Sequence, residues 1–208
     1  MQIRELKDDG EIEKLAILHK KAFPTFFLTQ LGLPFLKVLY KGYLDDKDSG
    51  IIVAVNGEKI IGFIAYSKDY PRFYKGLLKH KIIQFGWCAF LSILHHPSFT
   101  KRLFGAFKKS DSVVKSEKYV ELASICVEPS MSGKGIGTKL IDYLKSITDY
   151  DEYAFINLET DAEHNDAANR FYEKNGFKLT SEFITAEGRR MNEYRFSPER
   201  SCEKDFVH

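Results

Sequence analysis

The stretch from Tyr119 to Ile147 constrains the fold more than any other part of the chain. Residues 119–127, Tyr-Val-Glu-Leu-Ala-Ser-Ile-Cys-Val, are apolar and β-branched, which predicts a buried strand, and Pro129 prevents its extension as a central strand. Glycines follow at 133, 135 and 137, and apolar residues then recur with helical spacing from Ile136 onward. The sequence therefore predicts a strand, a glycine-rich turn and a helix in immediate succession.

The start of the predicted helix is a candidate anion-binding site. The first turn of a helix has backbone N–H groups without intrahelical partners, and the helix dipole adds partial positive charge there. Glycine permits left-handed dihedrals that turn successive N–H groups toward one point, and it has no Cβ to hold a phosphate away. Taken alone, the loop is equally compatible with a turn that only connects two elements.

Two common phosphate-binding loops do not match this stretch. A Walker loop requires Gly-x-x-x-x-Gly-Lys-Ser/Thr, but Gly135 follows Lys134 and Glu128 stands where the first glycine should be. A dinucleotide-binding loop requires Gly-x-Gly-x-x-Gly, whereas the glycines here are spaced Gly-x-Gly-x-Gly. Both classes of nucleotide site are therefore excluded.

Two linked motifs resemble the GNAT superfamily of acyl-CoA-dependent N-acyltransferases. The segment Ser-Gly-Lys-Gly-Ile-Gly-Thr at 132–138 is similar to the family's acyl-CoA loop, Gln/Arg-x-x-Gly-x-Gly/Ala, with Ser132 in place of Gln/Arg. Residues 165–177, Asn-Asp-Ala-Ala-Asn-Arg-Phe-Tyr-Glu-Lys-Asn-Gly-Phe, are similar to its later motif, Asn-x-x-Ala-x-x-x-Tyr-x-x-x-Gly-Phe. The resemblance covers 119–196 closely and 1–66 loosely, and it leaves 68–118 uncovered.

The order of elements predicts an α/β (α+β) fold, with the GNAT-like mixed, mostly antiparallel central sheet flanked by helices. Two helices come first, a hairpin turns at Asn56-Gly57, and the strand, glycine loop and helix follow. A strand at 154–158 should run parallel to the first one, and a hairpin over 177–196 should close the sheet. We expect one domain over 1–198, with a helical insertion at about 68–118 and a polar tail at 199–208.

The resemblance implies that acetyl-CoA is the acyl donor and indicates which residues hold it. If the two central strands diverge beyond Val127, an extended ligand can pair with the exposed backbone. The family's pantetheine arm does so, which implies backbone contacts from Ile125 and Val127, with Cys126 between them, and Asn165 near the pantetheine. The pyrophosphate is expected on Ser132, Gly133, Lys134, Gly135, Ile136, Gly137 and Thr138.

Acyl transfer to an amine needs a free amine, a polarised carbonyl and a proton for the departing thiolate. Tyr172 matches the family's tyrosine and is the candidate general acid; a buried structural tyrosine is the alternative. Glu121 is the candidate base, through water, because strand alternation should place it on one face with Ala123, Ile125 and Val127. An exposed carboxylate at the strand end is its alternative. The Val127 N–H is the expected donor to the thioester carbonyl.

Cysteine and histidine usage favours no covalent intermediate and no metal. Cys126 has no histidine positioned by sequence to activate it, and a buried strand cysteine is commoner. His95, His96 and His164 lack companions at metal-ligand spacing. Three cysteines, and an N-terminus without a basic start and apolar run, predict a cytoplasmic protein.

Residues 68–118 carry eleven Lys/Arg against three Asp/Glu, although the net charge of the whole chain is only +2. This excess favours an anionic partner, so the small-molecule amine acceptor could itself be anionic. The apolar run at 82–94 is too short to cross a bilayer, but it could lie on a membrane surface, cover the acceptor or form a homodimer contact. A helical hairpin packed on the domain is the simpler interpretation. We expect no nucleic-acid partner.

Three function classes follow from these observations. The first is an N-acetyltransferase that moves acetyl from acetyl-CoA to a primary amine by direct attack. The second is a non-catalytic acyl-CoA-binding regulatory module, which the replacement of Gln/Arg by Ser132 keeps open. The third is a peripheral membrane or interaction protein that acts through 70–107.

Overall fold

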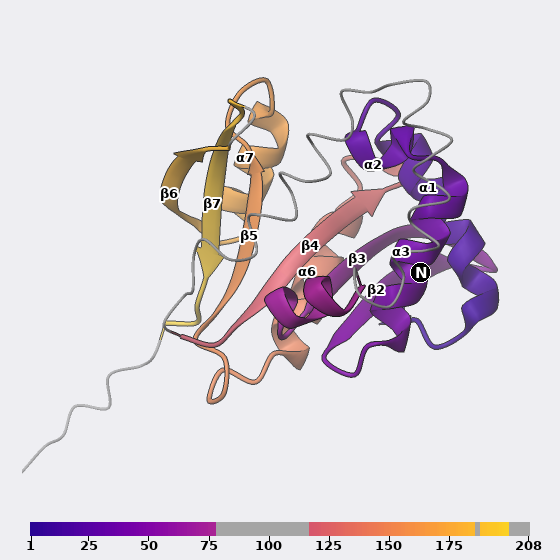
Figure 1. Ribbon diagram of the computed structural model, residues 1–208, viewed down its shortest axis with the longest axis horizontal. Helices are drawn as coiled ribbons and strands as arrows, with labels where there is room; N and C mark the ends of the chain where they lie inside the picture. The colour runs from indigo at the N-terminus through magenta and orange to yellow at the C-terminus, as the bar shows by residue number, and fades with distance from the viewer. Residues whose placement is uncertain (78–116, 186–187, 200–208) are drawn as a thin grey trace, which may run out of the picture.

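The computed structural model describes residues 1–77, 117–185 and 188–199. These residues form one seven-stranded sheet in the order β1-β2-β3-β4-β5-β7-β6, in which β4 and β5 are parallel and the other neighbours antiparallel (Figure 1). The predicted mixed, mostly antiparallel sheet is confirmed. The strands are β1 (Gln2–Glu5), β2 (Ser49–Asn56), β3 (Lys59–Ser67), β4 (Tyr119–Val127), β5 (Phe155–Asp161), β6 (Lys178–Ile184) and β7 (Arg190–Phe196).

The helices follow the start and stop signals in the sequence. Asp8 accepts a hydrogen bond from the Gly10 N–H and so caps a short 3-10 turn that leads into the first long helix, and Pro34 stands in the first turn of another. A one-turn helix lies between these two helices. The helices are η1 (Asp9–Glu11), α1 (Ile12–Ala22), α2 (Phe27–Gln30), α3 (Leu33–Asp45), η3 (Pro129–Met131), α6 (Ile136–Ile147) and α7 (Asp166–Lys174).

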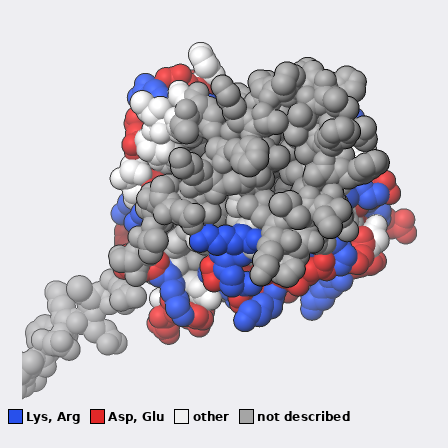
Figure 2. Space-filling model, in the orientation of Figure 1, with Lys and Arg blue, Asp and Glu red and all other residues white. Residues whose placement is uncertain are grey.

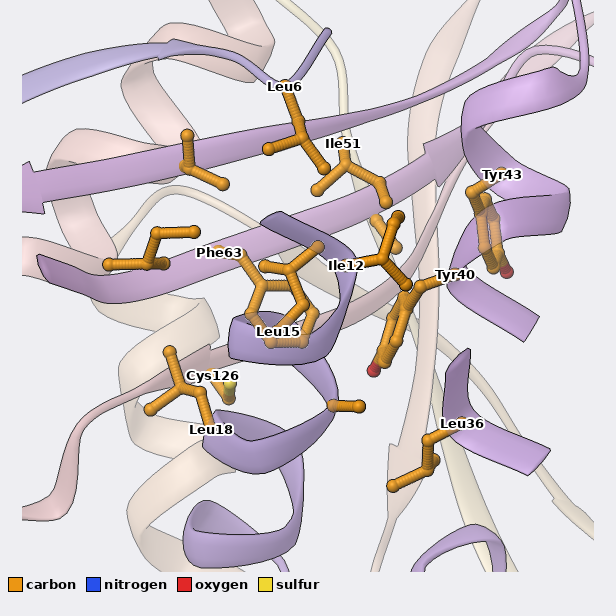
Figure 3. Close-up of a cluster of buried hydrophobic side chains, with 14 of the residues drawn as sticks. Leu6, Ile12, Leu15, Leu18, Leu36, Tyr40, Tyr43, Ile51, Phe63 and Cys126 are labelled. Atoms are coloured by element: carbon orange, nitrogen blue, oxygen red, sulfur yellow. The ribbon is translucent and has the colours of Figure 1, made fainter. Parts of the chain in front are cut away.

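One face of the sheet is covered by α1 and α3, which bury what we call the α1 cluster. Figure 3 shows Leu15 lying over Phe63 of β3, with Tyr40 of α3 beside them. The cluster includes Leu6, Ile12, Leu15, Leu18, Leu36, Tyr40, Tyr43, Ile51, Phe63 and Cys126, all less than a tenth exposed. Removal of this much apolar surface from water is the main force that fixes α1 and α3 on the sheet.

The opposite face is covered by α6 and α7, which bury the α6 cluster. Four of the five residues in the apolar stripe predicted for α6, Ile136, Leu140, Ile141 and Leu144, are fully buried here, and the fifth, Ile147, is partly buried. The stripe packs on Ile52, Ala54, Ile61, Ile64, Val120, Leu122, Ile156 and Leu158 of the sheet and on Tyr172 and Phe177. The strand, glycine turn and helix predicted at 119–147 therefore form the centre of the molecule.

A β-bulge in β4 changes which face its side chains occupy. Ala65 pairs with Ser124 and the next residue of β3 pairs with Leu122, so Ala123 is an extra residue in β4. Before the bulge, Val120 and Leu122 pack in the α6 cluster; after it, Ile125 and Val127 do. Ala123 and Cys126 pack in the α1 cluster instead. The expectation that side chains alternate regularly between the two faces along the whole of β4 is therefore wrong.

Several sequence-based expectations lie outside the described residues. These are most of the helical insertion predicted at about 68–118, including the apolar run at 82–94 and the pair His95 and His96, then two of the three cysteines, Cys88 and Cys202, and the tail beyond 199. Residues 70–77 are helical, as expected for the start of the insertion. Among the residues that are described, no helix is long and apolar enough to cross a membrane.

Candidate active site

The glycine turn before α6 adopts the left-handed backbone that its sequence predicts. Gly133 and Gly135 have φ values of 75° and 74°, and Gly135 is the N-cap of α6. A Cβ at either position would meet no atom within 4 Å, so the dihedral, rather than lack of space, requires glycine here. Residues 132–135 are exposed, and the turn therefore faces solvent with its backbone accessible.

The first N–H groups of α6 are arranged as an anion site requires. The first intrahelical bond of α6 runs from the Lys139 N–H to the Gly135 carbonyl, at 3.1 Å. The N–H groups of Ile136, Gly137 and Thr138 precede it and so lack intrahelical acceptors. The helix is 12 residues long, so its dipole adds positive potential at this end.

Gly137 has a different reason to be glycine. A Cβ there would lie 2.9 Å from Cζ of Phe171, a residue of α7. Its φ is not in the left-handed region, so the constraint is the close approach of the Phe171 ring to the first turn of α6. Gly137, the second small position of the loop motif, thus allows the segments 132–138 and 165–177 to come into contact.

The two central strands diverge soon after they meet. Pairing joins Tyr119–Glu121 of β4 with Phe155–Asn157 of β5, and in the described chain the register does not continue past Glu121. Figure 1 shows the strands together at one end and separated at the other. We call this divergence the strand split. It was expected beyond Val127 but begins six residues earlier, because the bulge at Ala123 turns β4 away from β5.

Backbone alternation directs two amides of β4 into the strand split. The Glu128 N–H donates to the Ile61 carbonyl of β3 at 2.8 Å, so Gly62 and Val127 form a non-hydrogen-bonded pair. The N–H and carbonyl of Val127 therefore point away from β3, toward the β5 side, and those of Ile125 do the same. These are the two residues expected to contact the pantetheine through their backbone.

Cys126 lies between them but points the other way. Its side chain is 4% exposed and packs in the α1 cluster, where Figure 3 shows it near Leu18. Burial raises the pKa of its thiol far above the usual range. A thiolate is therefore strongly disfavoured, so a covalent acyl-enzyme through Cys126 has no support in this geometry.

Glu121 lies at the apex of the strand split and is only 8% exposed. Its carboxylate accepts a hydrogen bond from Asn157 Nδ2 at 2.8 Å. Because of the bulge, Glu121 shares its face with Ala123 but not with Ile125 and Val127, which corrects the alternation argument. The alternative interpretation, an exposed carboxylate at the strand end, is wrong because the side chain is buried.

Aromatic side chains surround Glu121 on the face that α3 covers. Burial raises the pKa of Tyr43 and Tyr70, and the negative charge of Glu121 adds to the shift. Tyr119, two residues before Glu121, stacks on Phe155 with ring centroids 5.7 Å apart. The carboxylate therefore lies in a partly dry, aromatic environment next to the strand split.

Tyr172 lies on α7, on the opposite side of the sheet from Glu121. It is 9% exposed, and its ring centroid lies 6.0 Å from those of Phe177 and Tyr194. Burial raises its pKa to about 12. The phenol therefore stays protonated at neutral pH, as a general acid must, but it is a weaker acid than an exposed tyrosine.

Asn165 occupies the N-cap position of α7 without capping it through its side chain. Its Nδ2 instead donates to Thr160 Oγ1 at 2.7 Å and to the Asp161 carbonyl at 3.2 Å. The residue before it, His164, has a φ of 55°. Asn165 therefore fastens the start of α7 to the end of β5, on the far side of the strand split from Val127.

Sequence reasoning missed Asn157. The residue is 1% exposed, and it interrupts an otherwise apolar run, Phe-Ile-Asn-Leu, in β5. A buried amide in such a run is uncommon, and this was the signal from which Asn157 could have been identified in the sequence. Among the residues that the structure describes, no group of three metal-ligating side chains comes together.

A comparison with protein families shows which family the chain belongs to. The model of the "Acetyltransferase (GNAT) family" matches residues 12–177, most of the chain. The chain belongs to the GNAT family of acetyltransferases. This membership confirms the resemblance drawn from the two motifs and the expected enzyme class, an acyl-CoA-dependent N-acyltransferase. The acyl donor of this family is acetyl-CoA, as the motifs implied.

Solved structures agree with the fold of a GNAT domain. An N-acetyltransferase from Staphylococcus aureus Mu50 has a TM-score of 0.63 at 16% identity, over 94% of this chain and 100% of that one. Arabidopsis thaliana NAA60, solved in complex with acetyl-CoA, has 0.59 at 15%, over 96% and 99%. Ard1 from Thermoplasma volcanium has 0.58 at 15%, over 94% and 96%. No curated protein matches the sequence.

Proposed function

We propose that this GNAT protein transfers the acetyl group of acetyl-CoA to a primary amine by direct attack. The observation that carries the proposal is the strand split, with the amides of Ile125 and Val127 on its edge and the start of α6 beyond its end. An extended pantetheine can pair with that edge as an added strand. The acetyl-CoA complex of the Arabidopsis relative supports this donor.

We assign one part of acetyl-CoA to each structural element of the donor site. The pyrophosphate binds the backbone of 132–138 at the start of α6, the pantetheine lies between Val127 and Asn165, and the thioester carbonyl accepts from the Val127 N–H. That hydrogen bond strengthens as negative charge develops on the oxygen, so it favours the transition state over the ground state.

Two side chains carry the proton transfers of the chemical step. Glu121, directly or through water, takes the proton that the amine nitrogen loses as it bonds to the carbonyl carbon. The C–S bond breaks, and the leaving sulfur takes a proton from Tyr172. Water then returns a proton from Glu121 to Tyr172, so acetyl-CoA and amine give an amide and CoA, with the enzyme unchanged.

The charge of the acceptor is the least constrained part of the proposal. The expectation of an anionic acceptor rests on 68–118, most of which lies outside the described residues. The described face carries Glu121, Glu159 and Glu193 on three neighbouring strands. Arg195 of β7 lies in register with Asn157 on the same face and pairs with Glu193 at 2.8 Å. Three carboxylates against this one guanidinium leave an excess of negative charge that attracts a cation, so we propose an amine that retains a second positive charge.

A panel of small amines tests the proposed reaction. CoA release from acetyl-CoA would be measured with 1,4-diaminobutane, 2-aminoethanol and O-phosphoethanolamine, which carry a positive, no and a negative second charge. We expect transfer to be fastest with the diamine, and the advantage to shrink as salt screens the carboxylates. Equal rates for all three would contradict the charge assignment, and absence of transfer to any amine would contradict the reaction.

A second function is favoured by two features, the raised pKa of Tyr172 and the serine at position 132. With a pKa of about 12 and Ser132 in place of the usual Gln/Arg, the chain could bind acetyl-CoA without turnover, as a regulatory module. Tight acetyl-CoA binding without transfer to any amine of a broad panel would support that function. The membrane-surface role predicted for 70–107 lies largely outside the described residues.

A further inference from the structure

The apex of the strand split contains a buried polar atom that has no role in the proposed reaction. Asn157 is paired in register with Glu121, at the last position where β4 and β5 are joined. Its Nδ2 donates to Glu121, but its Oδ1 is buried and has no hydrogen-bond partner among the described residues. A buried amide oxygen without a partner costs about 1 to 3 kcal/mol of desolvation.

The orientation of this amide follows from its neighbour. A carboxylate only accepts hydrogen bonds, so the Asn157 amide must present its N–H to Glu121, and its oxygen is then directed elsewhere. The side chain is 1% exposed and shares its face with Glu121 and Glu159. The oxygen is therefore a fixed acceptor beside the proposed base.

An amine is the kind of ligand that this pair of groups would satisfy. A primary amine has more than one N–H, so it can donate to Glu121 and to Asn157 Oδ1 at once. Such a two-point contact orients the nitrogen lone pair, which is the group that attacks the thioester. It also removes the desolvation cost of the amide oxygen when substrate binds.

We infer that Asn157 is an acceptor-binding and positioning residue, whose Oδ1 accepts a hydrogen bond from the amine while its Nδ2 holds the Glu121 carboxylate. The inference rests on the proposed function, because it assumes that Glu121 is the base. The Nδ2 bond favours the charged form of Glu121 and so keeps it ready to accept a proton. Both roles belong to one side chain at the apex of the strand split.

Other charged and titratable groups also face Glu121 and limit which variants are informative. They come from each element packed against it: Tyr43 of α3, Tyr70 of the helix at 70–77, Tyr119 of its own strand, Glu159 of β5, and Glu193 and Arg195 of β7, which pair with each other at 2.8 Å. None of these is changed in the test, so a change in the titration of Glu121 can be assigned to Asn157.

The chain offers a matched control for this test. Asn192 of β7 is 7% exposed and also has a buried Oδ1 without a partner among the described residues, while its Nδ2 donates to Asn169. It is paired with Thr160, so it lies on the opposite face from Glu121. Asn192→Leu therefore removes an equivalent buried amide without touching the acceptor side.

The test compares Asn157→Leu, Asn157→Asp and Asn192→Leu, with 1,4-diaminobutane as the probe amine. For Asn157→Leu we expect KM for the amine to rise about tenfold, as for loss of one hydrogen bond to the substrate. The acid limb of the kcat/KM profile should move to higher pH, because Glu121 loses a donor to its charged form. The Kd of acetyl-CoA should stay within about twofold, since that site is untouched.

A second readout does not depend on activity. Titration of the Glu121 side-chain carbon by NMR should show a raised pKa in Asn157→Leu and a larger rise in Asn157→Asp, which is isosteric and adds a like charge. Asn192→Leu should change neither the NMR titration nor KM. If Asn157→Leu fails to fold, the same comparison is made with Asn157→Asp.

The outcomes separate this inference from the proposed function. A wild-type protein that binds acetyl-CoA but acetylates no amine contradicts the proposed function. A wild-type protein that acetylates 1,4-diaminobutane, with Asn157→Leu and Asn192→Leu indistinguishable from it in KM and in the Glu121 titration, overturns the role of Asn157 alone.

Discussion

At the scale of single residues, the surroundings of a side chain set its chemistry more than its identity does. Tyr172 and Tyr194 are both buried phenols of the α6 cluster, with ring centroids 6.0 Å apart. Tyr194 donates to Glu173 at 3.3 Å, whereas the Tyr172 hydroxyl has no hydrogen-bond partner among the described residues. Of these two phenols, Tyr172 is therefore the candidate to give its proton to a ligand.

The pair provides a matched test of the general acid. We expect Tyr172→Phe to lower kcat by about 100-fold, the usual contribution of a positioned acid, with little change in the Kd of acetyl-CoA. Tyr194→Phe removes an equivalent hydroxyl and should change kcat by less than about threefold. Steady-state kinetics with 1,4-diaminobutane would measure both, and equal losses in the two variants would contradict the assignment to Tyr172.

His19 is a second residue whose burial has a measurable consequence. It is 1% exposed, its Nδ1 lies 2.6 Å from Tyr40 Oη, and Nε2 is buried without a partner among the described residues. Burial lowers its pKa from 6.5 to about 4. The folded state therefore holds His19 neutral, as expected for a core histidine on the apolar stripe of α1.

The pKa of His19 predicts how stability depends on pH. Between about pH 6.5 and 4 the unfolded chain binds a proton that the folded chain does not, so stability falls as pH falls through this window. Between pH 6.5 and 5 the loss amounts to about 2 kcal/mol.

Urea unfolding of wild type and His19→Gln at both pH values measures this loss. The variant lacks the titrating group, so its stability should fall by about 2 kcal/mol less over the same interval. The same pH dependence in both proteins would show that His19 is not held neutral.

At the scale of elements, the sequence predicts most boundaries and fails where backbone geometry departs from regularity. The strand at Tyr119–Val127 and the helix from Ile136 were predicted closely, because apolar periodicity and glycine positions report on them directly. The bulge at Ala123 was not, since no glycine or charge marks it. This one extra residue moved the start of the strand split and reversed the faces of Ile125 and Val127.

Sequence patterns also do not reveal the contact between α6 and α7, but a substitution at the contact can test it. The absence of a Cβ at Gly137 lets the Phe171 ring reach the first turn of α6. Gly137→Ala gains up to about 1 kcal/mol of helix propensity but forces the ring to move, which typically costs about 1 to 3 kcal/mol. We therefore expect a net destabilisation, measured by urea unfolding.

A double-mutant cycle isolates this contact. Phe171→Leu shortens the side chain, so Gly137→Ala should be less destabilising, or even stabilising, in that background. If Gly137→Ala stabilises the wild-type protein, or costs the same in both backgrounds, the close approach of Phe171 is not what keeps this position small.

At the scale of the whole molecule, the split sheet explains why the two family motifs lie where they do. The loop at 132–138 follows β4 and the motif at 165–177 follows β5, so the point where these strands part lies between them. Sequence reasoning could predict both motifs and could have noted Asn157 as an amide in an apolar run. It could not predict the contact of Asn157 with Glu121, because that depends on the register between distant strands.

On the face shown in Figure 2, the described residues form no patch of a single charge that would indicate the acceptor. Along the lower edge of the face in Figure 2, basic and acidic side chains of the described residues lie side by side. The proposed acceptor side is distinguished instead by the inner carboxylates of β4, β5 and β7. On this proposal, buried and half-buried groups determine the choice of acceptor.

The measurement that tests the central claim most directly is calorimetric titration with acetyl-CoA of the wild type, Gly135→Glu and Gly57→Glu. Both glycines have positive φ, 74° and 60°, and open space around them, but Gly57 lies in the β2–β3 turn, away from α6. Both substitutions therefore add the same charge and a similar backbone strain.

The account predicts micromolar binding by the wild type and by Gly57→Glu, and binding weaker by about 100-fold or more, about 2.7 kcal/mol, for Gly135→Glu. A glutamate at Gly135 would place negative charge where the pyrophosphate should lie. Equal affinity of the two variants, or no binding by the wild type at millimolar acetyl-CoA, would contradict the placement of the donor at the start of α6.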